Sequence, residues 1–273
     1  MKHTPPSCSL TVSFAEKSDK AVILRRGPSA WVRMILWDTV TDRLRRGQWI
    51  KAALYAGHLS PNGELFACHV VKKNKRTKAD KEIGWAWTAI SRPPAFEAIY
   101  LWPRRTKHYG CGGHFLDDST FRLNHLESDA VPSPAHHPRK LRVIPGLYKA
   151  EEYPSSGFMH VEPEEVPDGT PGSPRPARYE LPRPSRGRKT KRPVDTLVRD
   201  GPVVWLRAAD GARIELPGVS WATFTRHGRL VFARGGALSS GEVVDGRLEE
   251  TLIADFTAER PDPKAWTGSA ESQ

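Results

Sequence analysis

The sequence predicts an all-β fold built from short antiparallel hairpins. Its apolar residues come in short clusters between turn residues, rather than at the three-to-four spacing of amphipathic helices. The 24 prolines and 22 glycines exceed the usual combined share, which favours many turns and few long helices. A length of 273 residues allows one large all-β domain or two modest ones.

The first strand-rich region spans residues 20–150. Turn-forming residues separate several of its strand candidates, at Gly27-Pro28, Ser60-Pro61-Asn62-Gly63 and Arg92-Pro93-Pro94. Short strands joined by tight turns predict a meander, in which each strand pairs with the next. The candidates are AVILRR, WVRMILWD, WIKAALY, ELFACHVV, WAWTAIS and FEAIYLW, followed by weaker ones at HFLDD and TFRLN.

Residues 1–19 are expected to form an N-terminal extension, and residues 151–195 a flexible insertion. The insertion begins with an acidic half, which has no Lys or Arg before Arg175. Its second half is rich in Arg and Pro. Such a composition buries too little apolar surface to offset the entropy of ordering the chain, so we expect an extended, mobile segment.

Strand signals resume over residues 196–257, which are expected to complete the same domain. Residues 258–273 are expected to form a disordered tail. Turns typical of two-residue hairpins occur at Asp210-Gly211, His227-Gly228, Gly235-Gly236 and Asp245-Gly246. The strand candidates between them are VVWLRA, RIEL, SWATF, RLVFARG, GEVV and LEETLIADF.

An internal repeat refines the prediction. The segments HLSPNGELFA, from His58, and TFTRHGRLVF, from Thr223, share a small polar residue, a turn that ends in glycine, a charged residue and an apolar strand. The glycine supplies the positive φ of a hairpin turn, after which the next strand runs back into the core. The matched positions are Ser60 and Thr225, Gly63 and Gly228, and Leu65 and Leu230.

The stretch Ser60-Pro-Asn-Gly-Glu-Leu65 resembles the inner-hairpin turn of β-propeller blades of the WD40 and TolB-like kind. The likeness covers residues 51–102 and 203–256. The arrangement of Arg25-Arg26-Gly27-Pro28-Ser29 before a Trp-rich strand also looks similar to that of bacterial proteins of unassigned function, grouped as propeller-like. The resemblance implies a propeller-like array of blades and no activity. The sequence lacks the regular Gly-His to Trp-Asp spacing of WD40 proteins, with Trp37-Asp38 as a single occurrence. If two unrelated hairpins share a common turn, a β-sandwich is the alternative.

The chain is strongly basic, with 42 Lys and Arg, 31 Asp and Glu, and a formal net charge of +11. Such a charge attracts nucleic acid, anionic membranes or acidic proteins. Pro5 and Pro6 interrupt the apolar core that a signal peptide needs, and no run of about 18 apolar residues occurs. Cys8, Cys68 and Cys111 form an odd set without paired spacing. We therefore predict a cytoplasmic protein without disulfides or membrane contact.

Basic side chains gather in three candidate binding segments. The first is a predicted hairpin loop between ELFACHVV and WAWTAIS, the second follows FEAIYLW, and the third is the insertion. Their contacts with phosphates would be non-specific and salt-dependent, and the alternative is that they are solvated loops. The candidates are Lys72, Lys73, Lys75, Arg76 and Lys78, with Lys81; Arg104 and Arg105, with Lys107; and Arg183, Arg186, Arg188, Lys189, Lys191 and Arg192.

One cluster has the spacing of metal ligands. His108-Tyr-Gly-Cys111-Gly-Gly-His114 can bring nitrogen and sulfur donors around a tetrahedral zinc ion. The alternative is a glycine-rich loop that carries two histidines, and no cofactor is predicted. A fourth ligand would have to come from Cys68, His125, His136 or His137.

The sequence contains no nucleophile elbow, phosphate-binding loop, His-Glu-x-x-His or Rossmann fingerprint. The carboxylates Glu64, Glu97, Asp117 and Asp118 are expected at turns and on the surface rather than as an acid/base pair. The leading hypothesis is a non-catalytic interaction scaffold that binds a protein partner through charged loops within a multi-protein bacterial assembly. The alternatives are a nucleic-acid-binding accessory protein and a zinc-dependent enzyme.

Overall fold

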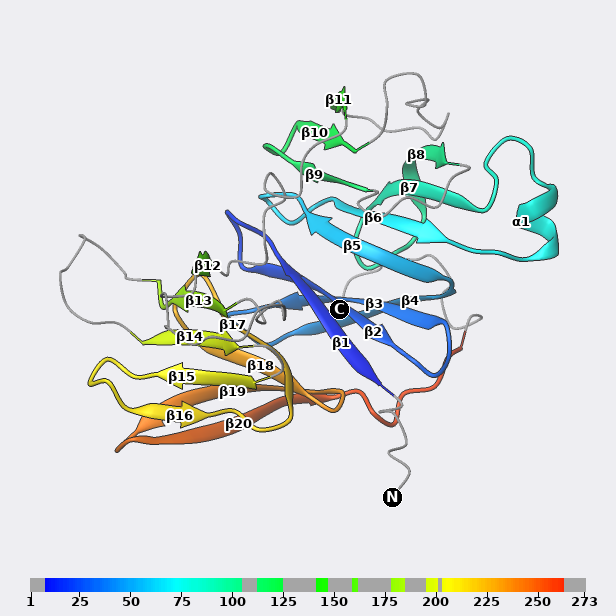
Figure 1. Cartoon of the computed structure of the whole chain (residues 1–273). Coiled ribbons are helices and arrows are strands. Elements are labelled where there is room, and N and C mark those ends of the chain that lie inside the picture. Colours follow the sequence, from blue (N-terminus) through cyan, green and yellow to red (C-terminus); the bar gives the residue numbers. More distant parts are fainter. Residues whose placement is uncertain are drawn as a thin grey trace, which may run out of the picture. The chain divides into compact units, whose positions relative to one another are not determined.

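The computed structural model describes residues 8–104, 112–124, 141–146, 159–161, 178–184, 195–200 and 203–262, and the structural statements below concern these residues. They form five β sheets and one short helix, α1 (Lys75–Ala79), so the predicted all-β class is confirmed (Figure 1). Within this part of the chain, no helix has the length and apolar character needed to cross a membrane.

The chain folds into two compact units, each of which includes a segment from the far end of the sequence. The N-terminal unit comprises Leu10–Pro154 and Glu259–Gln273. The C-terminal unit comprises Met1–Ser9 and Ser155–Ala258.

Three sheets belong to the N-terminal unit, and each strand lies beside its neighbour in sequence. The first contains β1 (Ser9–Phe14), β2 (Lys20–Arg26), β3 (Trp31–Asp38) and β4 (Leu44–Lys51). The second contains β5 (Ala53–Leu59), β6 (Phe66–Val71), β7 (Ala86–Ser91) and β8 (Ala98–Arg104). The third contains β9 (Gly113–Phe115), β10 (Thr120–Leu123) and β11 (Arg142–Pro145), of which β10 and β11 are parallel.

The sheets of the N-terminal unit pack through two apolar clusters. Between the first and second sheets, Val22 and Leu24 of β2 share a cluster with Phe66 and Cys68 of β6. A second cluster joins residues of the second and third sheets, where the rings of Trp102 and Phe121 stack with centroids 5.8 Å apart. Alternation of side chains along each strand lets the second sheet contribute to both clusters.

The C-terminal unit contains two antiparallel sheets. One has the order β12 (Met159–Val161), β13 (Arg178–Pro182), β14 (Thr196–Asp200), β15 (Val203–Arg207) and β16 (Arg213–Glu215). The other has the order β17 (Val219–Phe224), β18 (Leu230–Arg234), β19 (Ala237–Val244) and β20 (Arg247–Asp255). Leu197 and Leu206 from the first of these sheets share a buried cluster with Phe224 and Phe232 from the second.

The two repeated sequence segments fold into matching turns. Each turn joins the first and second strands of a four-stranded sheet, β5 to β6 and β17 to β18. Gly63 and Gly228 have φ values of +75° and +77°, and their N–H groups donate to the carbonyl oxygens of Ser60 and Thr225 at 2.8 Å. The Ser60 and Thr225 hydroxyls each accept a backbone N–H from the residues that follow. The predicted hairpin turn is confirmed at both places.

One predicted strand is divided between two sheets. The segment WIKAALY contains the end of β4 and the start of β5, with Ala52 between them. The Ala52 N–H donates to the carbonyl oxygen of Ala30 at 3.0 Å, where the chain leaves the first sheet. No glycine or proline marks this change of direction, so the apolar run alone suggests one strand.

Strands also occupy segments expected to lack them. β1 lies in the expected N-terminal extension, and its Leu10 and Val12 are buried. β12 and β13 lie in the expected insertion of residues 151–195, where Leu181 pairs in register with Leu197 of β14. Pairing with an existing sheet satisfies the backbone of a segment whose own composition could not form a core.

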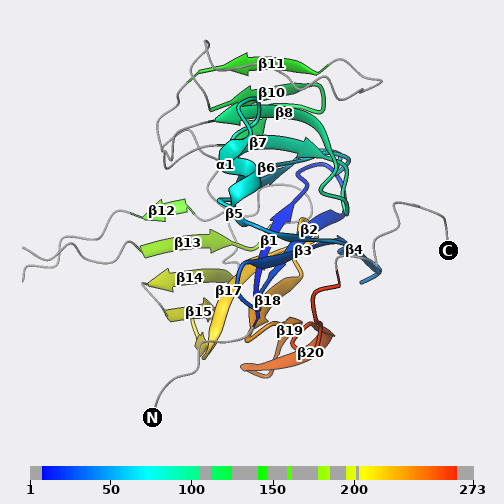
Figure 2. The ribbon, with the colours of Figure 1, turned by 90° about the vertical axis from the view of Figure 1, so that its right-hand side faces the viewer.

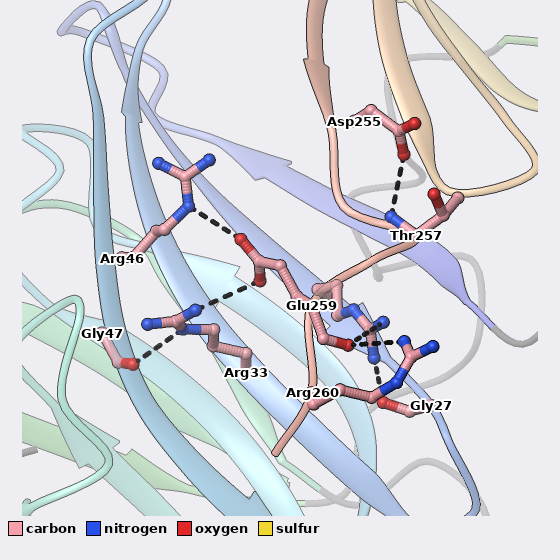
Figure 3. A network of polar contacts seen from close by, with 9 residues as sticks. Gly27, Arg33, Arg46, Gly47, Asp255, Thr257, Glu259 and Arg260 are labelled. Atoms are coloured by element: carbon pink, nitrogen blue, oxygen red, sulfur yellow. Dashed lines mark hydrogen bonds and ion pairs between the residues drawn. The ribbon is translucent and has the colours of Figure 1, made fainter. Parts of the chain in front are cut away.

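Within residues 258–262, expected to begin a disordered tail, Glu259 is held by a cluster of arginines (Figure 3). Glu259 accepts hydrogen bonds from Arg46 Nε at 2.7 Å and from Arg33 Nη1 at 3.2 Å through its two carboxylate oxygens. Its carbonyl oxygen accepts a hydrogen bond from Arg25 at 2.9 Å. The guanidinium carbons of Arg25 and Arg33 lie 5.2 and 5.5 Å from the ring centre of Trp49.

Candidate binding surface

The basic loop, residues 72–85, joins the antiparallel strands β6 and β7 in the N-terminal unit (Figure 2). Val71 pairs in register with Ala86, and the Lys72 N–H donates to the carbonyl oxygen of Trp85 at 2.9 Å. The predicted position of these cations, in a hairpin loop, is therefore confirmed. The strands that flank the loop, β6 and β7, are paired with each other, and β6 contributes to the buried core, so the loop extends from a well-packed sheet.

Local hydrogen bonds order the basic loop around α1. Asn74 is the N-cap residue, and its side chain accepts a hydrogen bond from the Thr77 N–H at 2.8 Å. Thr77 Oγ1 accepts one from the Asn74 N–H at 3.1 Å, which completes a capping box, and donates to the carbonyl oxygen of Lys72. These contacts satisfy N–H groups that a helix of five residues leaves unpaired. None of them uses a Lys or Arg side chain.

The cations of α1 are exposed. Lys75, Arg76 and Lys78 all lie on the helix, no acidic residue lies in its first turn, and none of its residues is buried. Lys75 and Lys78 are three residues apart, so like charges share one face and weaken the helix by a few tenths of a kcal/mol. The helix is thus formed despite its charges, which remain directed toward solvent.

A cation–π contact fixes one lysine at the base of the loop. Lys73 Nζ lies 4.2 Å from the ring centre of Trp85, whose side chain is half-buried. Such a contact is worth about 0.5–1 kcal/mol at an exposed site. It places one ammonium group beside an aromatic ring where the basic loop meets the start of β7.

The acidic residues of the basic loop do not cancel its charge. Hydrogen bonds from the backbone of Ile83 and Glu82 lower the pKa of Asp80, whose carboxylate thereby shapes the turn after α1. The loop contains two acidic residues, Asp80 and Glu82, and six Lys or Arg residues, so its net charge is +4. The loop is therefore a compact positive surface.

Of the other predicted cations, Arg104 pairs in register with Ala86, the residue that follows the basic loop, and Arg183 lies elsewhere. Arg104 ends β8, while Arg105, Lys107, Arg186, Arg188, Lys189, Lys191 and Arg192 lie outside the described residues. Arg183 belongs to the C-terminal unit, where its Nε donates to the carbonyl oxygen of Gly228 at 2.6 Å and its Nη1 pairs with Asp195 at 2.9 Å. Arg183 therefore braces the turn between β17 and β18.

The predicted metal cluster is described only at its last residue. His114 is buried on β9, whereas His108, Cys111, His125, His136 and His137 lie outside the described residues. Among the residues that are described, no three His, Cys, Asp or Glu side chains gather as a metal site would require. Cys68, a proposed fourth ligand, is buried on β6, and burial raises the pKa of its thiol to about 12.

A histidine pair that the sequence does not indicate lies between the second and third sheets. The rings of His58 and His114 meet edge to face, with centroids 6.0 Å apart. His58 Nδ1 accepts a hydrogen bond from the Phe115 N–H at 3.2 Å. Burial, with a smaller effect from His114, lowers the pKa of His58 to about 4. The imidazole is therefore neutral at physiological pH and joins β5 to β9.

The carboxylates considered for catalysis serve in turns or lie on the surface. Hydrogen bonds from the Ser119 hydroxyl and backbone lower the pKa of Asp117 to about 2. Asp118 accepts a hydrogen bond from the Asn62 N–H at 2.7 Å, which joins the β5–β6 and β9–β10 turns. Glu64 and Glu97 are exposed.

No protein-family model matches the chain, and no curated protein matches it. The function proposed below therefore depends on the geometry and charge of the basic loop.

Proposed function

We propose that the chain is a non-catalytic interaction scaffold that binds an acidic protein partner through the basic loop, within a multi-protein assembly of the bacterial cytoplasm. The observation that carries this proposal is the exposed set of Lys75, Arg76 and Lys78 on a capped helix. A rigid scaffold that presents a charged loop is a common arrangement for binding. Charge complementarity then speeds association and selects the partner.

A propeller-like scaffold is part of the proposal. Sheets in which each strand pairs with the next are what propeller blades require, and the matching turns at Ser60–Gly63 and Thr225–Gly228 support repeated units. Both turns join the first two strands of a four-stranded sheet, as the inner-hairpin turn of a WD40 or TolB-like blade does. Face-to-face packing of neighbouring sheets also suits a sandwich-like arrangement, which is the alternative architecture.

The experiment compares two variants that each lose three charges. Lys75→Gln/Arg76→Gln/Lys78→Gln removes the cations of α1 with residues that favour helix, and Arg92→Gln/Arg142→Gln/Arg247→Gln removes three exposed cations elsewhere. Partners captured with the wild-type chain from its native cells are purified and titrated against all three proteins. We expect about tenfold weaker binding by the α1 variant alone. Capture of no partner, or equal binding by both variants, contradicts the proposal.

Nucleic acid is the second candidate partner, and the contact between Lys73 and Trp85 favours it. Proteins that bind single-stranded nucleic acids combine aromatic rings, on which bases stack, with basic side chains that contact phosphates. The basic loop contains both. Binding should then fall steeply as salt rises from about 50 to about 200 mM. Titration of labelled single strands and duplexes with the α1 variant as control measures this. No binding at the lower salt eliminates the candidate.

A further inference from the structure

Arg26, in the N-terminal unit and outside the basic loop in sequence, carries a half-buried charge. It is the last residue of β2, on the face that also carries Val22 and Leu24, because alternate side chains of a strand share a face. Val22 and Leu24 are buried in the core between the first and second sheets. The aliphatic stem of Arg26 therefore lies at the rim of this core.

The protein offers this guanidinium little compensation. Arg26 Nε lies 3.4 Å from Thr11 Oγ1, and no acidic side chain of the described residues forms an ion pair with Arg26. Burial is the main influence and lowers the Arg26 pKa, against smaller opposing effects of Cys68 and Tyr55. Cys68 supplies no negative charge near neutral pH, because burial raises the pKa of its thiol to about 12.

The preceding residue shows how the same strand compensates another arginine. Arg25 is fully buried, but its terminal nitrogens donate to the carbonyl oxygens of Gly27 and Glu259, and its guanidinium lies over Trp49. A partly buried cation without such partners lowers the stability of the folded state. Charged groups kept under these conditions cluster at functional sites.

We infer that Arg26, with the Thr11 hydroxyl, binds the carboxylate or phosphate group of a small ligand. A guanidinium presents parallel N–H donors that match two oxygens of either group. The exposed Thr11 side chain lies beside Nε and supplies a further donor. Partial burial strengthens the attraction between the guanidinium and an anion, because less water screens it. This site shares no residue with the basic loop.

The test titrates wild-type protein and Arg26→Met with sodium phosphate and with sodium acetate, against sodium chloride at equal ionic strength, by calorimetry and thermal unfolding. We expect the wild type to bind at least one oxyanion, and Arg26→Met to bind it about tenfold or more weakly. The unfolding midpoint of Arg26→Met in chloride should not fall, because methionine fills the rim without a desolvated charge. A response to phosphate alone assigns a phosphorylated ligand, and one to acetate alone a carboxylate.

Three further variants separate the site from other effects. Thr11→Val removes an exposed hydroxyl and should weaken oxyanion binding severalfold in a folded protein, and Arg26→Lys should weaken it by losing the paired donors. These two decide the question if Arg26→Met fails to fold. Lys75→Gln/Arg76→Gln/Lys78→Gln should bind the oxyanion as the wild type does. The inference is overturned if chloride matches both oxyanions, if Arg26→Met and Thr11→Val bind normally, or if the α1 variant loses binding.

Discussion

A hydrogen bond of 2.7 Å joins Arg46 Nε to the Glu259 carboxylate, across 213 residues of sequence. The other carboxylate oxygen lies 3.2 Å from Arg33 Nη1, so one acidic side chain bridges β3 and β4 (Figure 3). The Glu259 side chain is 14% exposed, which limits screening by solvent. This contact fastens the segment after β20 to the first sheet.

Glu259→Gln is expected to lower the free energy of unfolding by about 2 kcal/mol, because Arg33 and Arg46 lose their shared anion while the side-chain shape is kept. Urea unfolding followed by tryptophan fluorescence measures the change. Glu250→Gln is the control, since both carboxylate oxygens of Glu250 accept hydrogen bonds from a single arginine, Arg234, in a more exposed place. We expect about 0.5 kcal/mol there. Equal losses of unfolding free energy in the two variants would show that the ion pairs of Glu259 contribute no more than an ordinary surface ion pair.

Acid is expected to destabilise the fold through His58. Its pKa is about 4 in the folded chain and about 6.5 when unfolded, so between these values the unfolded state binds more protons. Stability is therefore complete above about pH 6.5 and declines as the pH falls toward 4, by on the order of 3 kcal/mol. Urea midpoints measured from pH 7 to pH 4 test this.

His58→Asn is the control for this pH dependence. The side-chain oxygen of the introduced asparagine would take the position of Nδ1 and accept the hydrogen bond of the Phe115 N–H, but an amide does not titrate. The slope of stability between pH 6.5 and pH 4 should become shallower than in the wild type. An unchanged slope would assign the acid sensitivity to other groups.

Asn74→Ala is expected to loosen the basic loop without unfolding the sheets. The substitution removes the acceptor of the Thr77 N–H, a capping contact worth about 1 kcal/mol, so the amides of α1 should exchange about fivefold faster. Hydrogen exchange resolved by residue measures this, with Asn74→Asp as the control that keeps an acceptor. A global fall in the unfolding midpoint would mean that the loop supports the core.

The sequence predicts most strands because their alternation and turns are local. WVRMILWD coincides with β3, and the turns at Gly63 and Gly228 lie where the repeat places them. β1 carries the same alternation, with Leu10 and Val12 buried, although the prolines before it suggest an extension. By contrast, β13 becomes a strand through pairing with β14, which its own composition does not indicate.

The candidate sites likewise divide into those that local sequence predicts and those that depend on packing between distant segments. Six cations between two strand signals identify the basic loop, because a hairpin loop is a local feature. The environment of Arg26 and the contact between His58 and His114 depend on which sheets pack together. The Glu259 contact depends on the segment after β20 meeting β3 and β4. The spacing of residues along the sequence does not predict these long-range contacts.

The turn glycines should differ in their tolerance of alanine. Gly63 and Gly246 have similar φ values, +75° and +73°, but a Cβ on Gly63 would lie 2.7 Å from Lys20 Cβ, whereas one on Gly246 would meet no atom within 4 Å. Gly246→Ala should therefore cost about 1 kcal/mol through backbone strain, and Gly63→Ala about 2–3 kcal/mol through strain and crowding. Urea unfolding of both variants measures the difference, and equal losses would show that the β5–β6 turn shifts to make room.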